Sequence, residues 1–337
     1  MSLIATLQKR IMLLDGAMGT MLQSFRLQEK DFRGTLFTNH PMPLQGCYDI
    51  LNITNPLIVS RIHHDYLAAG ADIISTNTFN AQAVSLSQFG LEKHVREINL
   101  QAAKIARAVA DGFNSTSTMQ PRYVAGIIGP AHETESVPHK TLTPGSHPLA
   151  FDALVSVYAE QATALIDGGV DLLIVETIFD LHHVRAALSA LAKVFSQKGH
   201  ILPVMASLTA GEKNGVLLSG HTTDEFLALL LQQEVPLFSV GFNCSPGIGA
   251  ARPYLEKLSA TAPYFVHYYP AAGLPDRRGQ YPITPAGMAN AMKQYMQQGL
   301  VNIVGGCCGT TPEYVAAIAK LAKKYPPRNP QPYQHQC

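Results

Sequence analysis

Short apolar segments recur along the chain, and most are followed by a stretch in which apolar residues return every three or four positions. The short apolar segments are typical of strands buried on both faces of a parallel sheet. The stretches with a spacing of three or four residues are typical of helices that cover such a sheet. Strands are predicted at residues 11–15, 73–77, 124–129, 172–177, 202–208, 237–243, 264–268 and 302–306.

Helices are predicted between these strands, at residues 59–69, 150–168, 183–195, 223–233, 287–298 and 312–324. Alternating strands and helices indicate an α/β protein with a parallel sheet, and eight strands favour a closed (βα)8 TIM barrel over an open sheet. A chain of 337 residues is within the range of one such barrel. We therefore predict a single barrel domain at residues 1–324, followed at 325–337 by a Pro-rich tail or the start of an inter-module linker.

Two longer segments interrupt the alternation, at residues 25–54 and 132–147. Both follow predicted strand ends, so they are expected on the face of the barrel where enzymes of this fold carry their sites, and could shape or cover a site there. The second segment contains His132, Glu133 and His139, which are expected to face that site as donors to a ligand or as lid contacts.

Composition narrows the classes of function. The chain has 25 basic and 24 acidic residues without a Lys/Arg cluster, which argues against nucleic-acid binding. No apolar run approaches the roughly 20 residues that span a bilayer, so no membrane insertion is expected. The first ten residues lack the order of a secretory signal, and five cysteines, two of them adjacent, make a poor disulfide framework. A reduced, cytoplasmic protein is predicted.

Three cysteines directly follow or closely follow predicted strands. Cys244 comes after the sixth strand, and Cys307 and Cys308 come after the eighth, between glycines. Because the carboxyl ends of barrel strands meet on one face, the three thiols are expected close enough to share one ion. A catalytic zinc takes three protein ligands and keeps one position open for substrate. The residues alone leave open a second interpretation, in which these are buried structural or redox-active cysteines.

Acidic residues end two other predicted strands. Asp15 ends the first strand and precedes a glycine-rich turn that contains Gly16 and Ala17, and Glu176 lies near the end of the fourth. A carboxylate in an apolar strand end needs a cationic partner. The pattern favours an amino-acid ligand with its ammonium on Asp15 and Glu176 and its carboxylate on the turn amides and Thr76. The alternative is that both carboxylates bond to neighbouring backbone or to an arginine.

Longer motifs spread over nearly the whole chain resemble the zinc-dependent homocysteine S-methyltransferase family, and within it the N-terminal homocysteine module of cobalamin-dependent methionine synthases. They are residues 14–21 (Leu-Asp-Gly-Ala-Met-Gly-Thr-Met), 31–34 (Asp-Phe-Arg-Gly), 70–80, 129–130, 176–177, 241–244 (Gly-Phe-Asn-Cys) and 305–310 (Gly-Gly-Cys-Cys-Gly-Thr). The segments 31–34 and 76–80 favour the cobalamin-dependent type.

This resemblance implies a (βα)8 barrel with zinc on the three cysteines Cys244, Cys307 and Cys308, and with the homocysteine sulfur as exchangeable fourth ligand. It also implies that the ends of homocysteine are held by Asp15, Gly16, Thr76 and Glu176. The activity implied is attack of the zinc-bound thiolate on the methyl group of methylcobalamin, giving methionine. The methyl group would come from 5-methyltetrahydrofolate, and cobalamin-binding and folate-binding modules or subunits would be the partners.

Two departures from the resemblance matter. Methionine synthases tend to carry an asparagine where this chain has Ala271, so a water or another side chain must complete an empty zinc site. The large enzymes also continue into further modules, so the chain is expected to be a fragment or a subunit that works with separate proteins. Two other functions remain open: methyl transfer from S-methylmethionine or betaine, and a non-catalytic thiol-binding or redox-sensing zinc barrel.

Overall fold

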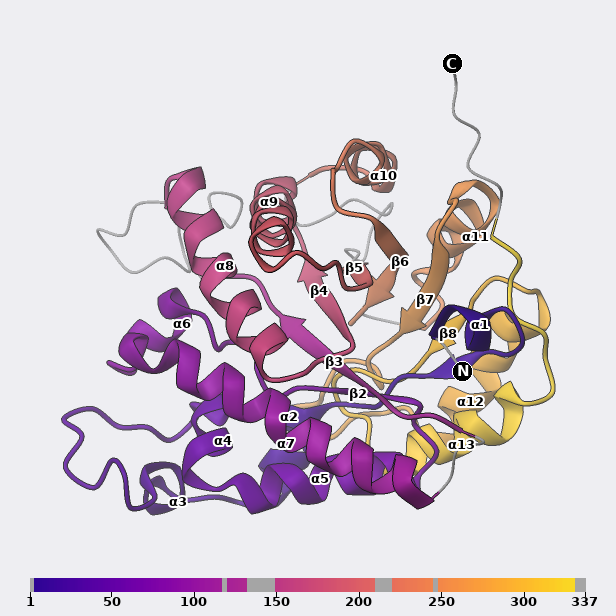
Figure 1. Ribbon diagram of the computed structural model, residues 1–337. Helices are drawn as coiled ribbons and strands as arrows, with labels where there is room; N and C mark the ends of the chain where they lie inside the picture. Colours follow the sequence, from indigo (N-terminus) through magenta and orange to yellow (C-terminus); the bar gives the residue numbers. More distant parts are fainter. Residues whose placement is uncertain (1–2, 117–119, 132–148, 210–219, 245–247, 331–337) are drawn as a thin grey trace.

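The protein forms a parallel barrel, seen in a computed structural model that describes residues 3–116, 120–131, 149–209, 220–244 and 248–330. The sheet has eight parallel strands in the order β1-β8-β7-β6-β5-β4-β3-β2, and a bridge between Leu14 and Ile73 joins its two ends (Figure 1). The strands are β1 (Met12–Leu13), β2 (Ile73–Ser75), β3 (Tyr123–Ile128), β4 (Leu172–Ile178), β5 (Val204–Leu208), β6 (Leu237–Asn243), β7 (Phe265–Tyr269) and β8 (Ile303–Val304). The predicted TIM barrel is confirmed, and β6 has the predicted bounds.

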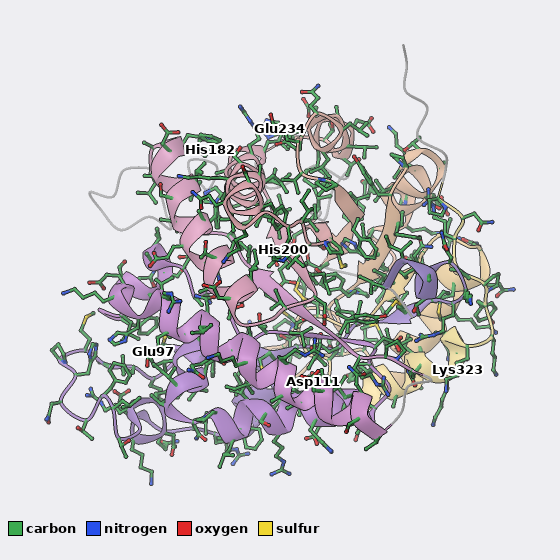
Figure 2. All side chains as sticks on the ribbon, viewed as in Figure 1. Glu97, Asp111, His182, His200, Glu234 and Lys323 are labelled. Carbon is green, nitrogen blue, oxygen red and sulfur yellow. A yellow bond between two sulfur atoms is a disulfide. The ribbon has the colours of Figure 1, made fainter. Side chains whose placement is uncertain are left out.

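Helices form the outer layer around these strands (Figure 1). They are α1 (Leu3–Leu7), α2 (Met18–Ser24), α3 (Glu29–Arg33), α4 (Leu51–Thr54), α5 (Pro56–Ala68), α6 (Ala83–Ser87), α7 (Val95–Thr116), α8 (Phe151–Asp167), α9 (Leu181–Lys198), α10 (Thr223–Leu231), α11 (Arg252–Thr261), α12 (Pro285–Gln297) and α13 (Pro312–Ala322), with 3-10 turns η1 (Tyr48–Ile50) and η2 (Glu92–His94). The six helices predicted from the sequence are all present; α7, α11 and the short helices α1, α2, α3, α4 and α6 were not predicted. Charged side chains such as Glu97 and Asp111 of α7 lie on the outer surface (Figure 2).

The barrel interior changes from apolar to polar along its axis. Near the end where the strands begin, most side chains of the interior are apolar, and α1 adds Leu3 and Leu7 to this cluster. The buried, hydrogen-bonded pair Ser239 and His267 of β6 and β7 is an exception. Toward the carboxyl ends of the strands the buried side chains become polar, among them Asp15, Ser207 and Asn243. Buried polar groups require hydrogen-bond partners, so this end of the interior is held by a specific network.

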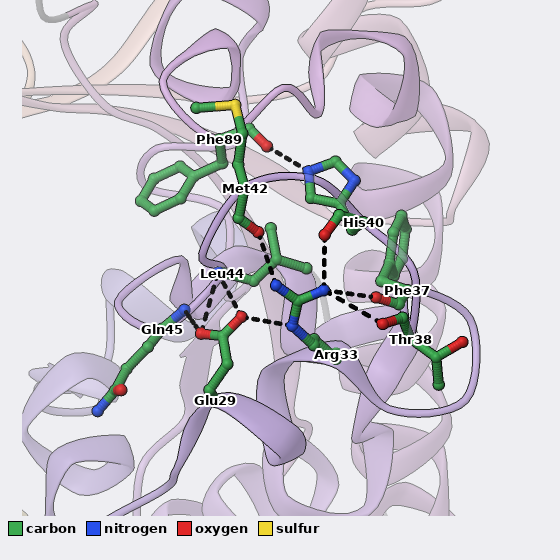
Figure 3. A network of polar contacts seen from close by, with 9 residues as sticks. All are labelled: Glu29, Arg33, Phe37, Thr38, His40, Met42, Leu44, Gln45 and Phe89. Carbon is green, nitrogen blue, oxygen red and sulfur yellow. Dashed lines mark hydrogen bonds and ion pairs between the residues drawn. The ribbon is translucent and has the colours of Figure 1, made fainter.

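In the first long segment, residues 25–54, a half-buried ion pair between Arg33 and Glu29 joins several parts of the chain (Figure 3). The Arg33 guanidinium donates to Glu29 Oε1 at 2.6 Å and also to backbone carbonyls of the same segment, those of Phe37, Thr38, His40 and Met42. Glu29 in turn accepts from the backbone N–H groups of Leu44 and Gln45. As predicted, the segment reaches the carboxyl end of the barrel, where Tyr48 and Asp49 line a cavity.

The second long segment, with His132, Glu133 and His139, lies outside the described residues. Its expected place near the site therefore stays a prediction. Among the helices of the described ranges, none combines the length and the apolar character that crossing a membrane would require.

The first part of the Pro-rich tail is attached to the barrel. Arg328 is only 4% exposed, and its guanidinium donates to the carbonyl oxygens of Ser259, Ala262 and Tyr264 at 2.7–2.8 Å. Asn302, which precedes β8, donates to the Arg328 carbonyl at 2.6 Å. As far as Pro330 the tail is therefore not loose, because one arginine satisfies carbonyl groups between α11 and β7 that would otherwise be buried without partners.

Replacing Arg328 with alanine is expected to lower the free energy of unfolding by about 2–4 kcal/mol, because several buried carbonyls lose their donor at once. Urea unfolding measures the change. Arg277→Ala, at an exposed position in the loop after β7, provides the control and should leave the free energy of unfolding unchanged. Equal stabilities of the Arg328→Ala and Arg277→Ala variants would show that the Arg328 side chain contributes nothing to the stability of the barrel.

Candidate active site

The structure brings Cys244, Cys307 and Cys308 together at the carboxyl end of the barrel. Their Sγ atoms all lie within 4.8 Å of one another, and those of Cys244 and Cys308 are 3.2 Å apart. Cys244 and Cys307 are in disulfide contact, with Cα atoms 5.6 Å apart. All three sulfurs can act as ligands to one ion only as reduced cysteines, since the thiolate is the form that binds a metal.

The backbone near these cysteines leaves regular strand geometry. Cys244 has φ 47°, in the left-handed region that non-glycine residues rarely adopt. The loop after β8 is fixed to the loop after β7, since Cys307 N donates to the Pro270 carbonyl at 2.9 Å and the Cys308 carbonyl accepts from Ala272 N at 2.8 Å. These restraints present two adjacent cysteines to Cys244, although adjacent residues of a regular strand point to opposite faces.

The donor set fits zinc. Three thiolates are the soft ligands that zinc accepts, and Zn–S bonds of about 2.3 Å suit sulfurs gathered this closely. Burial raises the pKa of the Cys308 thiol, and the charge of Glu176 adds to the increase. Such a thiol is protonated at neutral pH unless a cation binds it. Within the described ranges, no other trio of His, Cys, Asp or Glu side chains has the spacing of metal ligands.

Asp15 is a buried carboxyl group, and its hydrogen bonds come from an uncharged residue. Its Oδ2 accepts from Ser75 N at 2.7 Å and its Oδ1 from Ser75 Oγ at 2.8 Å. Burial raises the pKa of Asp15 to about 7, although both hydrogen bonds oppose that shift. The sequence left open that Asp15 bonds to neighbouring backbone, and these hydrogen bonds are present. They do not neutralise the negative charge of an ionised Asp15.

Glu176 lines the same cavity as Asp15. Its Oε2 accepts from the Tyr269 hydroxyl at 3.1 Å. Burial raises the pKa of Glu176 to about 7, and the charge of Asp15 raises it further. Two carboxyl groups that disfavour each other's ionisation in a cavity form a site that gains from a bound cation.

The turn after β1 is packed tightly against the loop after β8. A Cβ atom on Gly16 would lie 2.7 Å from Thr310 Oγ1 and 2.9 Å from the Tyr66 hydroxyl, so only glycine fits there. Ala17 N already donates to Thr310 Oγ1 at 3.3 Å. The Thr76 hydroxyl also has protein partners, since it accepts from Ile127 N at 3.0 Å and pairs with Thr78. These residues shape the wall of the cavity.

One cavity of about 360 Å³ collects every residue that the sequence proposed for the site. These are Asp15, Gly16, Ala17, Thr76, Glu176, Cys244, Cys307 and Cys308. Its volume lies at the small end of the range of small-molecule sites, which is about 300–1,000 Å³. A sulfur cluster at one part of the wall and two carboxyl groups at another match the two ends of a thiol-bearing amino acid.

Sequence reasoning missed several residues of this wall. Tyr269 is the last residue of β7, one position beyond the predicted strand end, so reading the residue after each predicted strand would find it. Ser75 lies inside a strand, and Tyr281 lies in an irregular loop without periodicity. Packing between loops, which local patterns do not report, places Tyr281.

Comparison with known sequences supports what the geometry indicates. The sequence model of a family described as homocysteine S-methyltransferase matches residues 12–322. The chain belongs to the homocysteine S-methyltransferase family. The resemblance to this family drawn from the motifs is thereby confirmed, and the protein is a methyltransferase of the kind that methylates homocysteine; the narrower resemblance to the cobalamin-dependent type stays a prediction.

Solved structures share the fold. The homocysteine methyltransferase MmuM from Escherichia coli is 22% identical in sequence; its metallated form gives a TM-score of 0.71, covering 94% of this chain and 98% of that one. The oxidized form of the same enzyme gives a TM-score of 0.67, covering 92% of this chain and 95% of that one. A 2-naphthoyl-CoA reductase, 13% identical, gives 0.52, covering 80% of this chain and 47% of that one. At these identities the similarity concerns the barrel alone.

Proposed function

We propose that this protein holds a zinc ion on Cys244, Cys307 and Cys308, binds L-homocysteine beside it, and methylates the homocysteine sulfur to give methionine. The observation that carries the proposal is the meeting of three Sγ atoms, within 4.8 Å of one another, on the wall of a cavity that also contains Asp15 and Glu176. Because the three thiols must stay reduced, a cytoplasmic location agrees with this function.

Different residues bind the two ends of the substrate. When bound, zinc lowers the pKa of the homocysteine thiol so that the sulfur is present as a thiolate at neutral pH. Asp15 and Glu176 receive the ammonium group, and the turn at Gly16 and Ala17 lies where the carboxylate would be held, with Thr76 in the same wall. Holding both ends fixes the sulfur in position, and such positioning lowers the barrier of a reaction between two partners.

For the methyl donor we propose methylcobalamin carried by a separate domain or protein, with the methyl group supplied from 5-methyltetrahydrofolate. Support comes from residues 31–34 and 76–80, which resemble the cobalamin-dependent type. Arg33 of the first motif stabilises the segment that brings Tyr48 and Asp49 to the cavity, so this motif has a structural part in forming the site. Small donors are the competing possibility.

Zinc-edge absorption of the reduced protein, with and without L-homocysteine, tests the first part of the proposal. We expect bound zinc with three sulfur neighbours, gaining a fourth when homocysteine is added, together with release of a proton. A zinc site whose neighbours do not change on adding homocysteine would identify a structural metal instead. Absence of zinc from protein kept reduced and supplied with the metal would contradict the proposal.

Turnover with three donors in parallel tests the second part. We expect the purified chain to form methionine from homocysteine and methylcobalamin, and not from S-methylmethionine or betaine. Methionine formed from either small donor, without reaction of methylcobalamin, would replace the proposed donor while leaving the zinc chemistry intact.

A further inference from the structure

Asn243 connects three strand ends at the top of the barrel. It is the last residue of β6 and is fully buried. Its Oδ1 accepts from Thr177 N at 3.1 Å and from Ser207 Oγ at 2.9 Å. Its Nδ2 donates to Thr177 Oγ1 at 2.8 Å and lies 3.9 Å from Cys307 Sγ, within reach of a hydrogen bond to sulfur. A side-chain amide has two acceptor and two donor positions, and here all four have partners.

The orientation of this amide is determined by its partners. Exchanging the oxygen and nitrogen would bring the NH2 group against Thr177 N, which is also a donor. The oxygen must therefore face β4 and β5, and one N–H must face the sulfur of Cys307. Asn243 thus links the strand that carries Glu176 with the loop that carries the cysteine pair.

Unusual backbone lies on either side of this link. Among the described non-glycine residues only Arg26, Thr177 and Cys244 have positive φ, and the latter two have values of 57° and 47°. The pairing of β4 with β5 shifts register between Val175 and Ile178, around Thr177. Non-glycine residues keep a left-handed conformation only where surrounding contacts impose it, and Asn243 contributes two of those contacts at Thr177.

We propose that Asn243 is a positioning residue that sets the distance between the ammonium end and the sulfur end of the site. It holds the irregular part of β4 that presents Glu176, immediately precedes Cys244, and donates an N–H to the Cys307 sulfur. This inference rests on the proposed zinc and homocysteine chemistry. Groups that hydrogen-bond to metal ligands orient them and tune their charge, and losing one weakens metal binding or activity by about 10–100-fold.

Two substitutions separate the parts of this role. Asn243→Ala removes all four contacts. Asn243→Asp keeps the size and the oxygen that accepts from Thr177 N and Ser207. It loses both N–H donors: the Thr177 hydroxyl can compensate by donating to the carboxylate, whereas the Cys307 thiolate has no proton to donate. The control is Asn302→Ala, because Asn302 is equally buried and its amide makes hydrogen bonds through both its oxygen and its nitrogen, at the opposite end of the barrel.

Zinc affinity, measured by competition with a coloured chelator, is expected to fall about 10–100-fold in Asn243→Ala, with weaker homocysteine binding, and to stay unchanged in the folded Asn302→Ala control. With cobalt(II) in place of zinc, the sulfur-to-metal charge-transfer band of Asn243→Asp should move to longer wavelength, since the Cys307 thiolate loses a donor. A merely structural role would not move that band.

The failure of this inference is distinct from the failure of the proposed function. If the unsubstituted, reduced chain binds no zinc, the proposed function itself is wrong. If it binds zinc, and Asn243→Ala binds zinc equally well with an unshifted cobalt band in Asn243→Asp, then Asn243 is no positioning residue. Should Asn243→Ala fail to fold, the band of the Asp variant alone decides.

Discussion

Replacing Cys308 with alanine is expected to strip zinc from the reduced protein and to abolish methyl transfer to homocysteine. The change removes one of the three sulfurs that lie within 4.8 Å of one another. Thiolate-rich zinc sites bind with about 10–16 kcal/mol in total, so losing one ligand should weaken binding on the order of 10²–10³-fold. Cys308 lies in the loop after β8 and is the least buried residue of the trio, although its thiol is partly shielded from solvent, so its truncation leaves the barrel core intact.

Metal analysis after dialysis, combined with the rate of homocysteine-dependent demethylation of methylcobalamin, measures this effect. The matched control is Cys47→Ala. Cys47 is also a free cysteine, but it is buried in the core, and burial raises the pKa of its thiol to about 12. The control should keep zinc and activity. Full zinc content and full activity in Cys308→Ala would disprove the mechanism, and the same holds for Cys307→Ala.

The barrel could be predicted from the sequence because its strands are buried on both faces. Continuous apolar runs mark such strands, and all eight were located, with β6 at the predicted bounds. The short strands β1 and β8 were predicted too long, since their ends turn into loops fixed by tertiary contacts such as Gly306 N to the Asp15 carbonyl. The attachment of the tail through Arg328 has no periodic signal, because it depends on carbonyls distant in sequence.

Those residues of the candidate site that lie at or just after strand ends could be predicted from the sequence. In a barrel the residue types after the strands are enough to bring Cys244, the cysteine pair, Asp15 and Glu176 to one cavity. The hydrogen bonds that support these residues could not be predicted in this way. Asn243 looks like an ordinary strand residue in the sequence, and only the coordinates show that its amide bridges β4, β5 and the Cys307 loop.

Binding of the ammonium group is expected to strengthen as the pH rises through about 7, the pKa to which burial raises both Asp15 and Glu176. Below that pH the carboxyl groups are protonated, and protons compete with the cation. Each proton that must leave weakens binding tenfold per pH unit, and the two groups titrate as a coupled pair. Methionine, which has no ionisable thiol, isolates this effect from deprotonation of the homocysteine sulfur.

Glu176→Gln tests which group carries the effect. The amide keeps the size of the side chain but cannot neutralise an ammonium, so binding of methionine should weaken on the order of 10²-fold at pH values where Glu176 is ionised. The loss should shrink as the pH falls below about 7, where the wild-type carboxyl is itself neutral. Calorimetric titrations between about pH 6 and pH 8 measure both quantities. Glu97→Gln, on the exposed face of α7, is the control.

Stability of the ligand-free protein should respond to pH in the opposite direction. Because the folded-state pKa of Glu176 is raised, the folded protein binds more protons than the unfolded chain between about pH 4 and pH 7, and its free energy of unfolding falls as the pH rises through that window. Glu176→Gln should make the free energy of unfolding fall less steeply with pH, and the remaining pH dependence should come from Asp15. Methionine should restore stability above pH 7, since its ammonium compensates the buried charges. A substitution that changed neither the pH dependence of stability nor that of binding would remove Glu176 from the ammonium site.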